Sequence, residues 1–200
     1  GAYASALLTK YWLWPMPLGL AAAGLAAALA GAIMAVIVAR LRGDYLAIVT
    51  LGFGEIVRIF MNNLNAPINL TNGPQGISQI GPLRFGPLHL DDPLTLFGVT
   101  VTPSALYYYA FLLCALLIIF VTVRLEDSRI GRAWVAIRED EIAAKACGIN
   151  TRNIKLLAFA MGASFGGVAG GLFAGFQGFI SPESFNLFES IIVLCMLVLG

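Results

Sequence analysis

The 200-residue sequence is poor in charge: Asp, Glu, Lys and Arg make up only 12% of it, whereas hydrophobic residues make up 59%. Soluble domains carry roughly 25% charged residues, because their surfaces must stay solvated. The mean hydropathy of +0.86 is correspondingly high. Too little charge is present to cover a globule of this size. The composition therefore predicts an integral membrane protein of the all-α class, a polytopic helical bundle.

Motifs that carry chemistry are also scarce. The sequence has no GxxxxGK[ST] phosphate-binding loop and no set of nucleophile, base and acid, so we expect no enzymatic activity and no cofactor bound by this chain. The cysteines Cys114, Cys147 and Cys195 lack metal-ligand or redox spacing, and the single His89 has no Cys or His nearby. No metal site is therefore predicted. No basic block points to nucleic acid as a partner.

The charges that are present gather in one segment. Seven of the twelve Lys and Arg residues fall between Arg124 and Lys155, whereas the other long polar stretch, residues 61–104, holds only Arg84. Loops rich in Lys and Arg stay on the cytoplasmic side of a membrane. This asymmetry predicts a cytoplasmic loop over residues 124–155 and an extracytoplasmic loop, rich in Asn, Gly and Pro turns, over residues 61–104.

Long apolar runs predict the membrane spans, since a helix needs about 20 mostly apolar residues to cross a bilayer. The qualifying runs are residues 18–39, 105–123, 156–179 and 188–200, the last being cut short. The run over residues 45–60 is short and contains charges, so it predicts either a short spanning helix or a broken one. The expected total is four or five spans. Because the sequence begins at Gly1 rather than Met and stops inside an apolar run, we expect a fragment that lacks further helices at both ends.

Glycines in the 156–179 span form two stripes with a spacing of four residues. One contains Gly162, Gly166 and Gly170, and beside it lie Gly167, Gly171 and Gly175. Small residues let helices approach closely in lipid, so the stripes predict tight helix packing. A glycine-lined translocation path is the alternative interpretation. Asn150 and Thr151 can cap this span at its start.

Residues 132–147 predict one short amphipathic helix in the basic loop, with Gly148 placed where a C-cap glycine belongs. Glu141 and Lys145 form a favourable i, i+4 pair. The residues at helical spacing on one side are Trp134, Ile137 and Ala144. A solvated linker lying on the lipid headgroups is the alternative.

Several motifs, taken together, resemble one known family. The stretch EIAAKACG at residues 141–148 resembles the EAA-loop signature of ATP-binding-cassette (ABC) importer permeases. Four further matches are similar to the high-affinity branched-chain amino-acid permeases: LRGDYLAIVTLGFGEIVR at 41–58, TNGPQGI at 71–77, GRAWVAIREDEI at 131–142 and GFISPESF at 178–185. Their order and coverage identify the chain as a member of that family.

The resemblance implies a permease subunit that imports Leu, Ile or Val across the bacterial (or archaeal) cytoplasmic membrane. Its implied partners are two ABC ATPase subunits, a second related permease, a periplasmic or lipid-anchored substrate-binding protein and membrane lipid. ATP and Mg²⁺ would be bound by the ATPases alone. Other classes stay open: a related ABC importer for urea, amides or other amino acids, an ion-coupled secondary transporter, and a non-transporting scaffold or receptor.

The resemblance also implies roles for the basic loop. Its helix would be a coupling helix that docks in a groove of the ATPase. Glu141, Ala144 and Gly148 would form the docking surface, and Trp134 and Ile137 would anchor the helix.

Charged residues and turns elsewhere receive roles on the same basis. Glu55 and Arg58, three residues apart on one helical face, would either hold helices together or line the route near its outer side. Arg42 and Asp44 would lie at the cytoplasmic edge between two helices. Two outer turns would face the binding protein or shape an outer gate, one with Asn72, Gly73, Pro74 and Gly76 and the other with Pro182 and Glu183.

Overall fold

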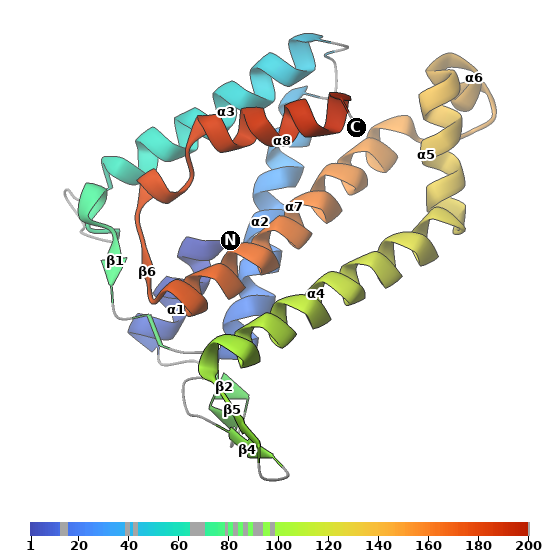
Figure 1. The fold of residues 1–200 in the computed structure, drawn as a ribbon. Helices are drawn as coiled ribbons and strands as arrows, with labels where there is room; N and C mark the ends of the chain where they lie inside the picture. Colours follow the sequence, from blue (N-terminus) through green and yellow to red (C-terminus); the bar gives the residue numbers. More distant parts are fainter. Residues whose placement is uncertain are drawn as a thin grey trace.

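The computed structural model describes residues 1–12, 16–38, 41, 44–64, 71–78, 80–81, 84–85, 88–89, 94–96 and 99–199. Among these residues, four helices are long and apolar enough to cross a membrane. They are α2 (Met16–Val38), α3 (Asp44–Asn62), α4 (Pro103–Glu126) and α7 (Thr151–Gln177). The polytopic helical fold predicted from composition is therefore confirmed (Figure 1).

Helices α2 and α7 pack against each other along the centre of the molecule, and α1 (Ala2–Trp12) contacts both. Small residues make this contact close: a Cβ atom on Gly31 would lie 2.5 Å from the Ala163 Cβ. Such packing is the main source of helix association in lipid. Helix α1 was not predicted, because its 11 residues are too few for a span and its aromatic end resembles a membrane interface.

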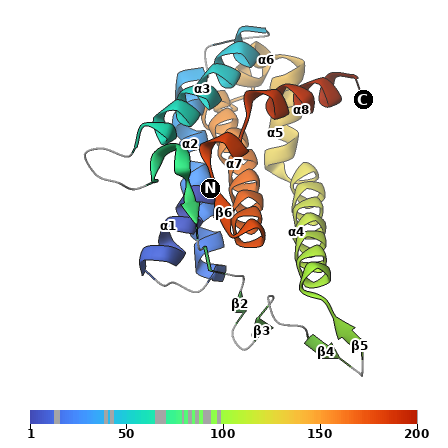
Figure 2. The ribbon, with the colours of Figure 1, turned by 60° about the vertical axis from the view of Figure 1, so that its left-hand side comes forward.

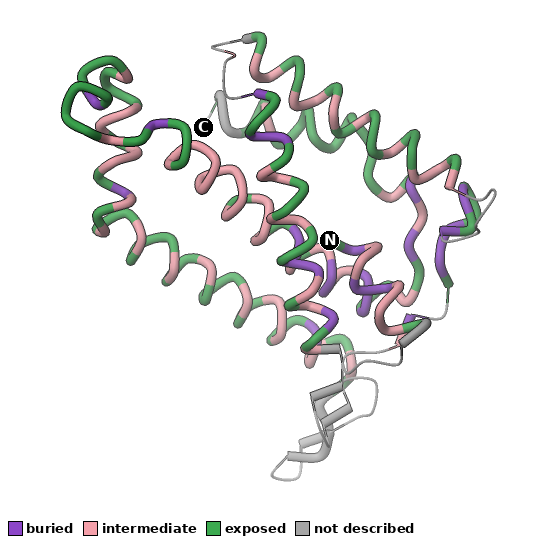
Figure 3. The backbone as a smooth tube through the Cα atoms, turned by 180° about the vertical axis from the view of Figure 1, so that it is seen from behind, coloured by how far each residue is buried: buried purple, intermediate pink, exposed green. Residues whose placement is uncertain are grey.

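Helices α3 and α4 lie on opposite sides of the α2–α7 pair (Figures 1 and 2). Tyr107 attaches α4, since its ring is buried and its Oη donates a hydrogen bond to the Gly175 carbonyl at 3.1 Å. Helix α3 runs unbroken from Asp44 to Asn62, so the segment is not the broken helix that its charges allowed. Buried residues concentrate on α1, α2 and the second half of α7, whereas α4 is exposed or half-buried along nearly all of its length (Figure 3).

The polar region between α3 and α4 is more ordered than a series of turns. It contains the short helix η1 (Gly73–Gln75) and five short strands: β1 (Ile77–Ser78), β2 (Arg84–Phe85), β3 (Leu88–His89), β4 (Leu94–Leu96) and β5 (Val99–Val101). The β2–β3 and β4–β5 pairs are antiparallel. β-branched residues such as those of β5 favour extended backbone. The prediction of a loop made of turns therefore missed these small β elements, although the all-α class stands.

The basic loop folds as two helices rather than the single helix predicted over residues 132–147. They are α5 (Arg129–Glu139) and α6 (Glu141–Ala146), and they are separated by Asp140, whose backbone is extended (φ −150°, ψ 112°). The Asp140 carboxylate accepts hydrogen bonds from the amides of Ile142 at 2.7 Å and Ala143 at 3.2 Å. Asp favours such caps over helix interiors, which explains the break.

The last two helices begin and end at slightly different residues from the predicted spans 156–179 and 188–200. Helix α7 begins at Thr151, five residues before the apolar run, because Asn150 caps it by accepting a hydrogen bond from the Asn153 amide. That cap was predicted. After β6 (Phe179–Ile180) and the short helix η2 (Pro182–Ser184), α8 (Leu187–Leu199) has 13 residues, and residue 200 lies outside the description.

Candidate functional site

The Glu141 carboxylate connects α6 to α7. Its Oε2 accepts a hydrogen bond from Lys155 Nζ at 2.7 Å, and its Oε1 lies 3.1 Å from Lys145 Nζ. The hydrogen bond from Lys155, followed by that from Lys145, lowers the pKa of Glu141 from its ordinary 4.5 to about 2. The predicted Glu141–Lys145 pair is confirmed. The Lys155 contact was missed because 14 residues separate it from Glu141, beyond the reach of helix spacing rules.

Two predicted coupling residues, Trp134 and Ala144, make contacts within the basic loop and with α7. The Trp134 Nε1 donates a hydrogen bond to the Ile154 carbonyl at 2.9 Å, which attaches α5 to the first turns of α7. Ala144 is only 4% exposed. Since the chain breaks at Asp140, Trp134, Ile137 and Ala144 do not share one helical face as expected. Ala144 is therefore part of the interior rather than of a docking surface.

Gly148 ends α6 in a left-handed conformation, with φ +83° as a C-cap glycine requires. Its amide donates to the Lys145 carbonyl at 3.0 Å, and the Ile149 amide donates to the Ala144 carbonyl at 3.0 Å. These two bonds form a Schellman motif, in which an L side chain at the left-handed residue is strained. The predicted turn at Gly148 is confirmed.

The outward side of α6 carries a residue that sequence analysis did not select. Ile142 is 74% exposed, although it is a large aliphatic side chain between charged residues. Ala143, next to it, is also exposed. The sequence signal for Ile142 is an aliphatic residue inside a polar, charged loop.

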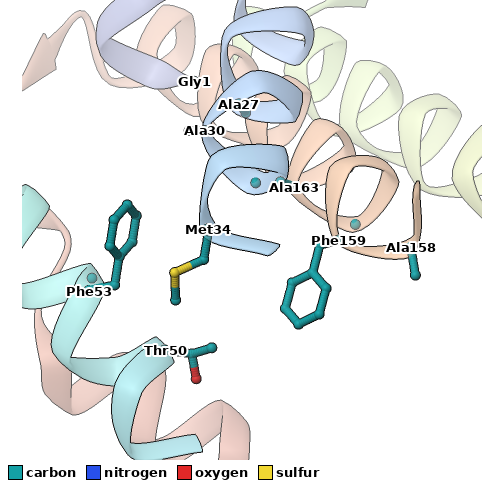
Figure 4. A pocket seen from close by; sticks show the side chains of 12 residues that line it. Gly1, Ala27, Ala30, Met34, Thr50, Phe53, Ala158, Phe159 and Ala163 are labelled. Atoms are coloured by element: carbon teal, nitrogen blue, oxygen red, sulfur yellow. The ribbon is translucent and has the colours of Figure 1, made fainter. Parts of the chain in front are cut away.

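A groove of about 690 Å³ lies between α2, α3 and α7. Figure 4 shows Thr50 and Phe53 of α3 on one side of it, with Met34 of α2 and Phe159 of α7 across from them. The lining is almost entirely apolar. Among the described lining residues, Thr50 has the polar side chain, and its hydroxyl already donates to the carbonyls of its own helix.

A second cavity of about 320 Å³ adjoins the groove and shares Ala27, Gly54 and Ala163 with it. It extends toward the other end of α3, where Arg58 and Pro182 line it. Together the two spaces follow α7 over much of its length.

The two glycine stripes of α7 face different neighbours. A Cβ on Gly167 would lie 2.6 Å from the Ala23 carbonyl, and one on Gly171 would lie 2.8 Å from a Leu20 methyl, so this stripe is packed on α2. A Cβ on Gly162 or Gly166 would meet nothing within 4 Å. Gly162 lines the groove and Gly166 the second cavity.

Gly170 belongs by spacing to the open stripe but approaches α1. A Cβ there would lie 3.3 Å from the Ala2 amide nitrogen, and Gly170 also lines the second cavity. The predicted tight packing is confirmed at Gly167 and Gly171, whereas Gly162 and Gly166 face open space. The translocation path remains a prediction.

Glu55 and Arg58 form the predicted ion pair. The Arg58 Nε lies 3.0 Å from each carboxylate oxygen of Glu55, and its Nη2 also donates to Oε1. Both residues belong to α3, so this pair connects no second helix. Arg58 lines the second cavity. Arg42 lies outside the described residues, and Asp44 is the first residue of α3, with its side chain outside the description.

The two predicted outer turns lie side by side. Strands β1 and β6 pair antiparallel, with Ile77 opposite Ile180, and η1 contacts η2. Gly76 has φ +69°, and a Cβ there would collide with the Ile180 carbonyl. Asn72 and Gly73 are left-handed as well.

Some residues of these two turns are exposed and available to a partner, whereas others are buried. Pro182 is buried, so it supports the pair rather than presenting a contact surface. Pro74 and Glu183 are exposed. The pairing itself joins positions about a hundred residues apart, which no local pattern predicts.

Comparisons with known proteins agree with this architecture. The family described as the permease component of branched-chain amino acid transport systems matches residues 1–200. The high-affinity branched-chain amino acid transport system permease protein LivM of Escherichia coli (strain K12) is 48% identical over the whole of this chain and 49% of its own length. LivM of Salmonella typhimurium is 47% identical over the same shares.

A second kind of permease protein also matches, over a shorter stretch. LivH of Salmonella typhimurium, from a transport system of the same description, is 31% identical over 62% of this chain and 38% of its own. The chain spans about half the length of the LivM relatives. No solved structure matches it.

Proposed function

The chain belongs to the permease-component family of branched-chain amino acid transport systems, and from this premise we propose that it forms part of the path by which an ABC importer carries Leu, Ile or Val across the bacterial (or archaeal) cytoplasmic membrane. It is a multi-pass membrane segment. Two separate ATPase subunits would supply the energy, a second related permease would complete the path, and a substrate-binding protein would deliver the amino acid. The similarity to both LivM and LivH supports the pairing of two related permeases.

The observation that carries the proposal is the hydrogen-bonded connection between the basic loop and α7, the helix that lines the groove. Glu141 and Trp134 attach the basic loop to α7 at Lys155 and Ile154. One turn further along, Ala158 and Phe159 of the same helix line the groove. A displacement of α6 by an ATPase would therefore tilt α7 and change the width of the groove, which is how alternating access could be driven from outside the membrane.

The surface of the groove suits an aliphatic cargo. Among the described residues that line it, the side chains are uncharged, and small or apolar ones predominate. An ion-coupled secondary transporter would need ionisable groups near the bilayer midplane. Among the described residues that line the groove and the second cavity, the charged side chain is Arg58, which is already paired with Glu55 of its own helix. The selection among amino acids would rest mainly with the binding protein.

Replacement of Gly148 by Val tests the coupling. A β-branched residue at φ +83° costs about 1–3 kcal/mol of strain, so the turn after α6 should change. In the full-length permease assembled with its ATPases and binding protein, we expect Gly148→Val to lower leucine-stimulated ATPase activity and ATP-dependent leucine uptake by about tenfold.

Gly52→Val provides the matched control, because Gly52 lies within α3 and a Cβ there meets nothing within 4 Å. That variant should keep both activities. Full stimulated ATPase activity in Gly148→Val would refute the coupling role. Uptake that is abolished by an uncoupler but indifferent to ATP would refute the ABC-importer proposal as a whole.

A further inference from the structure

A cavity of about 460 Å³ lies where α2 ends and α7 begins, beneath α6. Its polar side is formed by Lys145, Arg152 and Lys155, together with Glu141 and the Thr151 side of the α7 N-terminus. Its apolar wall is formed by Val36 and Ile37 of α2, which are 49% and 58% exposed. The cavity is distinct from the groove between α2, α3 and α7, with which it shares no lining residue.

The charges around this cavity do not balance. Among the described residues that line it, three cationic side chains face one carboxylate, which leaves these side chains with a net charge of +2. Glu141 already binds both Lys145 and Lys155. Arg152 forms no ion pair within the described part of the chain, and its side chain is exposed. An anion seated beside Arg152 would neutralise the excess without breaking the Glu141 contacts.

The apolar wall continues along α2 as a track of exposed side chains. Leu25, Leu29 and Ile33 are 67%, 67% and 60% exposed. At about 100° per residue, Leu25, Leu29 and Val36 fall on one side of the helix, opposite the Ala27 and Gly31 side that lines the groove. The track therefore leads from the basic cavity over residues 25–36, about half of α2.

We propose that this cavity binds the phosphate of an anionic phospholipid, with one acyl chain lying along the track of Leu25, Leu29 and Val36. Both α2 and α7 are membrane-spanning and both terminate here, so the cavity lies at the level of lipid headgroups. Basic pockets between spans on the cytoplasmic side bind anionic headgroups. A free phosphate would use the basic side alone, whereas a phospholipid satisfies both the charge and the apolar wall.

Lipid titration of the purified full-length permease, assembled with its partner subunits in detergent, tests the proposal. The measurement is the rise in melting temperature on addition of phosphatidylglycerol, of phosphatidylcholine with the same acyl chains, or of inorganic phosphate. Phosphatidylglycerol should raise the melting temperature, and the other two should have little effect. Arg152→Gln should require about fivefold more phosphatidylglycerol for the same effect, since one basic residue near the membrane surface contributes about that factor.

Matched variants separate the site from general charge effects. Arg138→Gln removes an exposed cation of α5 that does not line the cavity, and it should respond as the wild type does. Arg152→Lys should keep most of the response, and Val36→Asn should weaken it. An equal response in Arg152→Gln and Arg138→Gln would overturn the proposal. An equal effect of inorganic phosphate would assign the cavity to a free anion and overturn it as well. Neither result bears on which substrate is transported.

Discussion

Glu141 is held by ammonium groups from two different helices, Lys145 of α6 and Lys155 of α7. These contacts lower its pKa from 4.5 to about 2. Between pH 4.5 and about pH 2, Glu141 therefore binds fewer protons in the folded protein than in the unfolded chain. The stability that Glu141 contributes is therefore fully present above about pH 4.5 and is lost as the pH falls toward 2.

Glu141→Gln should weaken this pH dependence. We expect thermal unfolding of the full-length wild type to shift to lower temperature between pH 5 and pH 3, and the shift to be smaller in the variant, since a carboxamide does not titrate. Glu139→Gln on α5, where the side chain is exposed, is the control and should follow the wild type. Identical profiles for Glu141→Gln and wild type would show that the two lysines do not determine the behaviour of α6.

Asp140 separates α5 from α6, and its side chain is the cap on which the six-residue α6 depends. Asp140→Ala should destabilise α6 by about 0.5–2 kcal/mol. The amides of Ile142 and Ala143 should then exchange with deuterium up to about tenfold faster. Asp127→Ala, at the exposed end of α4, should leave these rates unchanged. Unchanged exchange at Ile142 in Asp140→Ala would mean that α6 does not depend on this cap.

Helix α7 combines a packed side and an open side, and adjacent glycines distinguish the two. A Cβ on Gly167 would lie 2.5 Å from the Ala27 Cβ and 2.6 Å from the Ala23 carbonyl, whereas one on Gly166 would meet nothing within 4 Å. Gly167→Ala should therefore destabilise the full-length permease by about 1–3 kcal/mol through overpacking. Gly166→Ala should be neutral or slightly stabilising, because Ala favours helix.

The comparison is made by thermal unfolding of both variants in the same detergent. Equal effects would mean that α2 and α7 do not meet at Gly167. A loss of leucine transport in Gly166→Ala at unchanged stability would further support Gly166 as part of the path.

The elements that sequence predicted well are those determined by local properties. Apolar length predicts the spans, because crossing a bilayer requires a helix of fixed length whatever its neighbours. The C-terminal turn at Gly148 and the cap at Asn150 depend on residues within one helical turn. These features need no knowledge of the rest of the fold.

The elements that sequence did not predict depend on contacts between distant residues or on competition between local signals. Helix α1 forms because it can pack on α2 and α7, although it is too short to span. The pairing of β1 with β6 and the bond from Lys155 to Glu141 join residues far apart in the chain. At Asp140, capping outweighs the good helix formers on either side.

At the scale of the whole molecule, the basic and the turn-rich segments lie at opposite ends. Helices α5 and α6 lie at one end, and the strands of the α3–α4 region lie at the other (Figure 1). The predicted outer turns lie away from α5 and α6 as well: η2 follows the C-terminal end of α7, whose N-terminal end adjoins α6, and η1 contacts η2. The basic end should face the cytoplasm, where an ATPase can reach α6, and the β end should face a substrate-binding protein outside.

Cys147 reports this orientation, because it lies exposed directly after α6. In the full-length protein with Cys114, Cys195 and any other cysteine replaced by Ala, a membrane-impermeant maleimide should label Cys147 in inside-out vesicles and not in intact cells. Gln75→Cys on η1, with Cys147 also replaced, is the matched probe of the other end, since Gln75 is exposed. It should be labelled in the opposite preparation. Labelling of Cys147 from outside the cell would place α6 out of reach of any cytoplasmic ATPase, and the proposed coupling would then be wrong even though the family and the fold would stand.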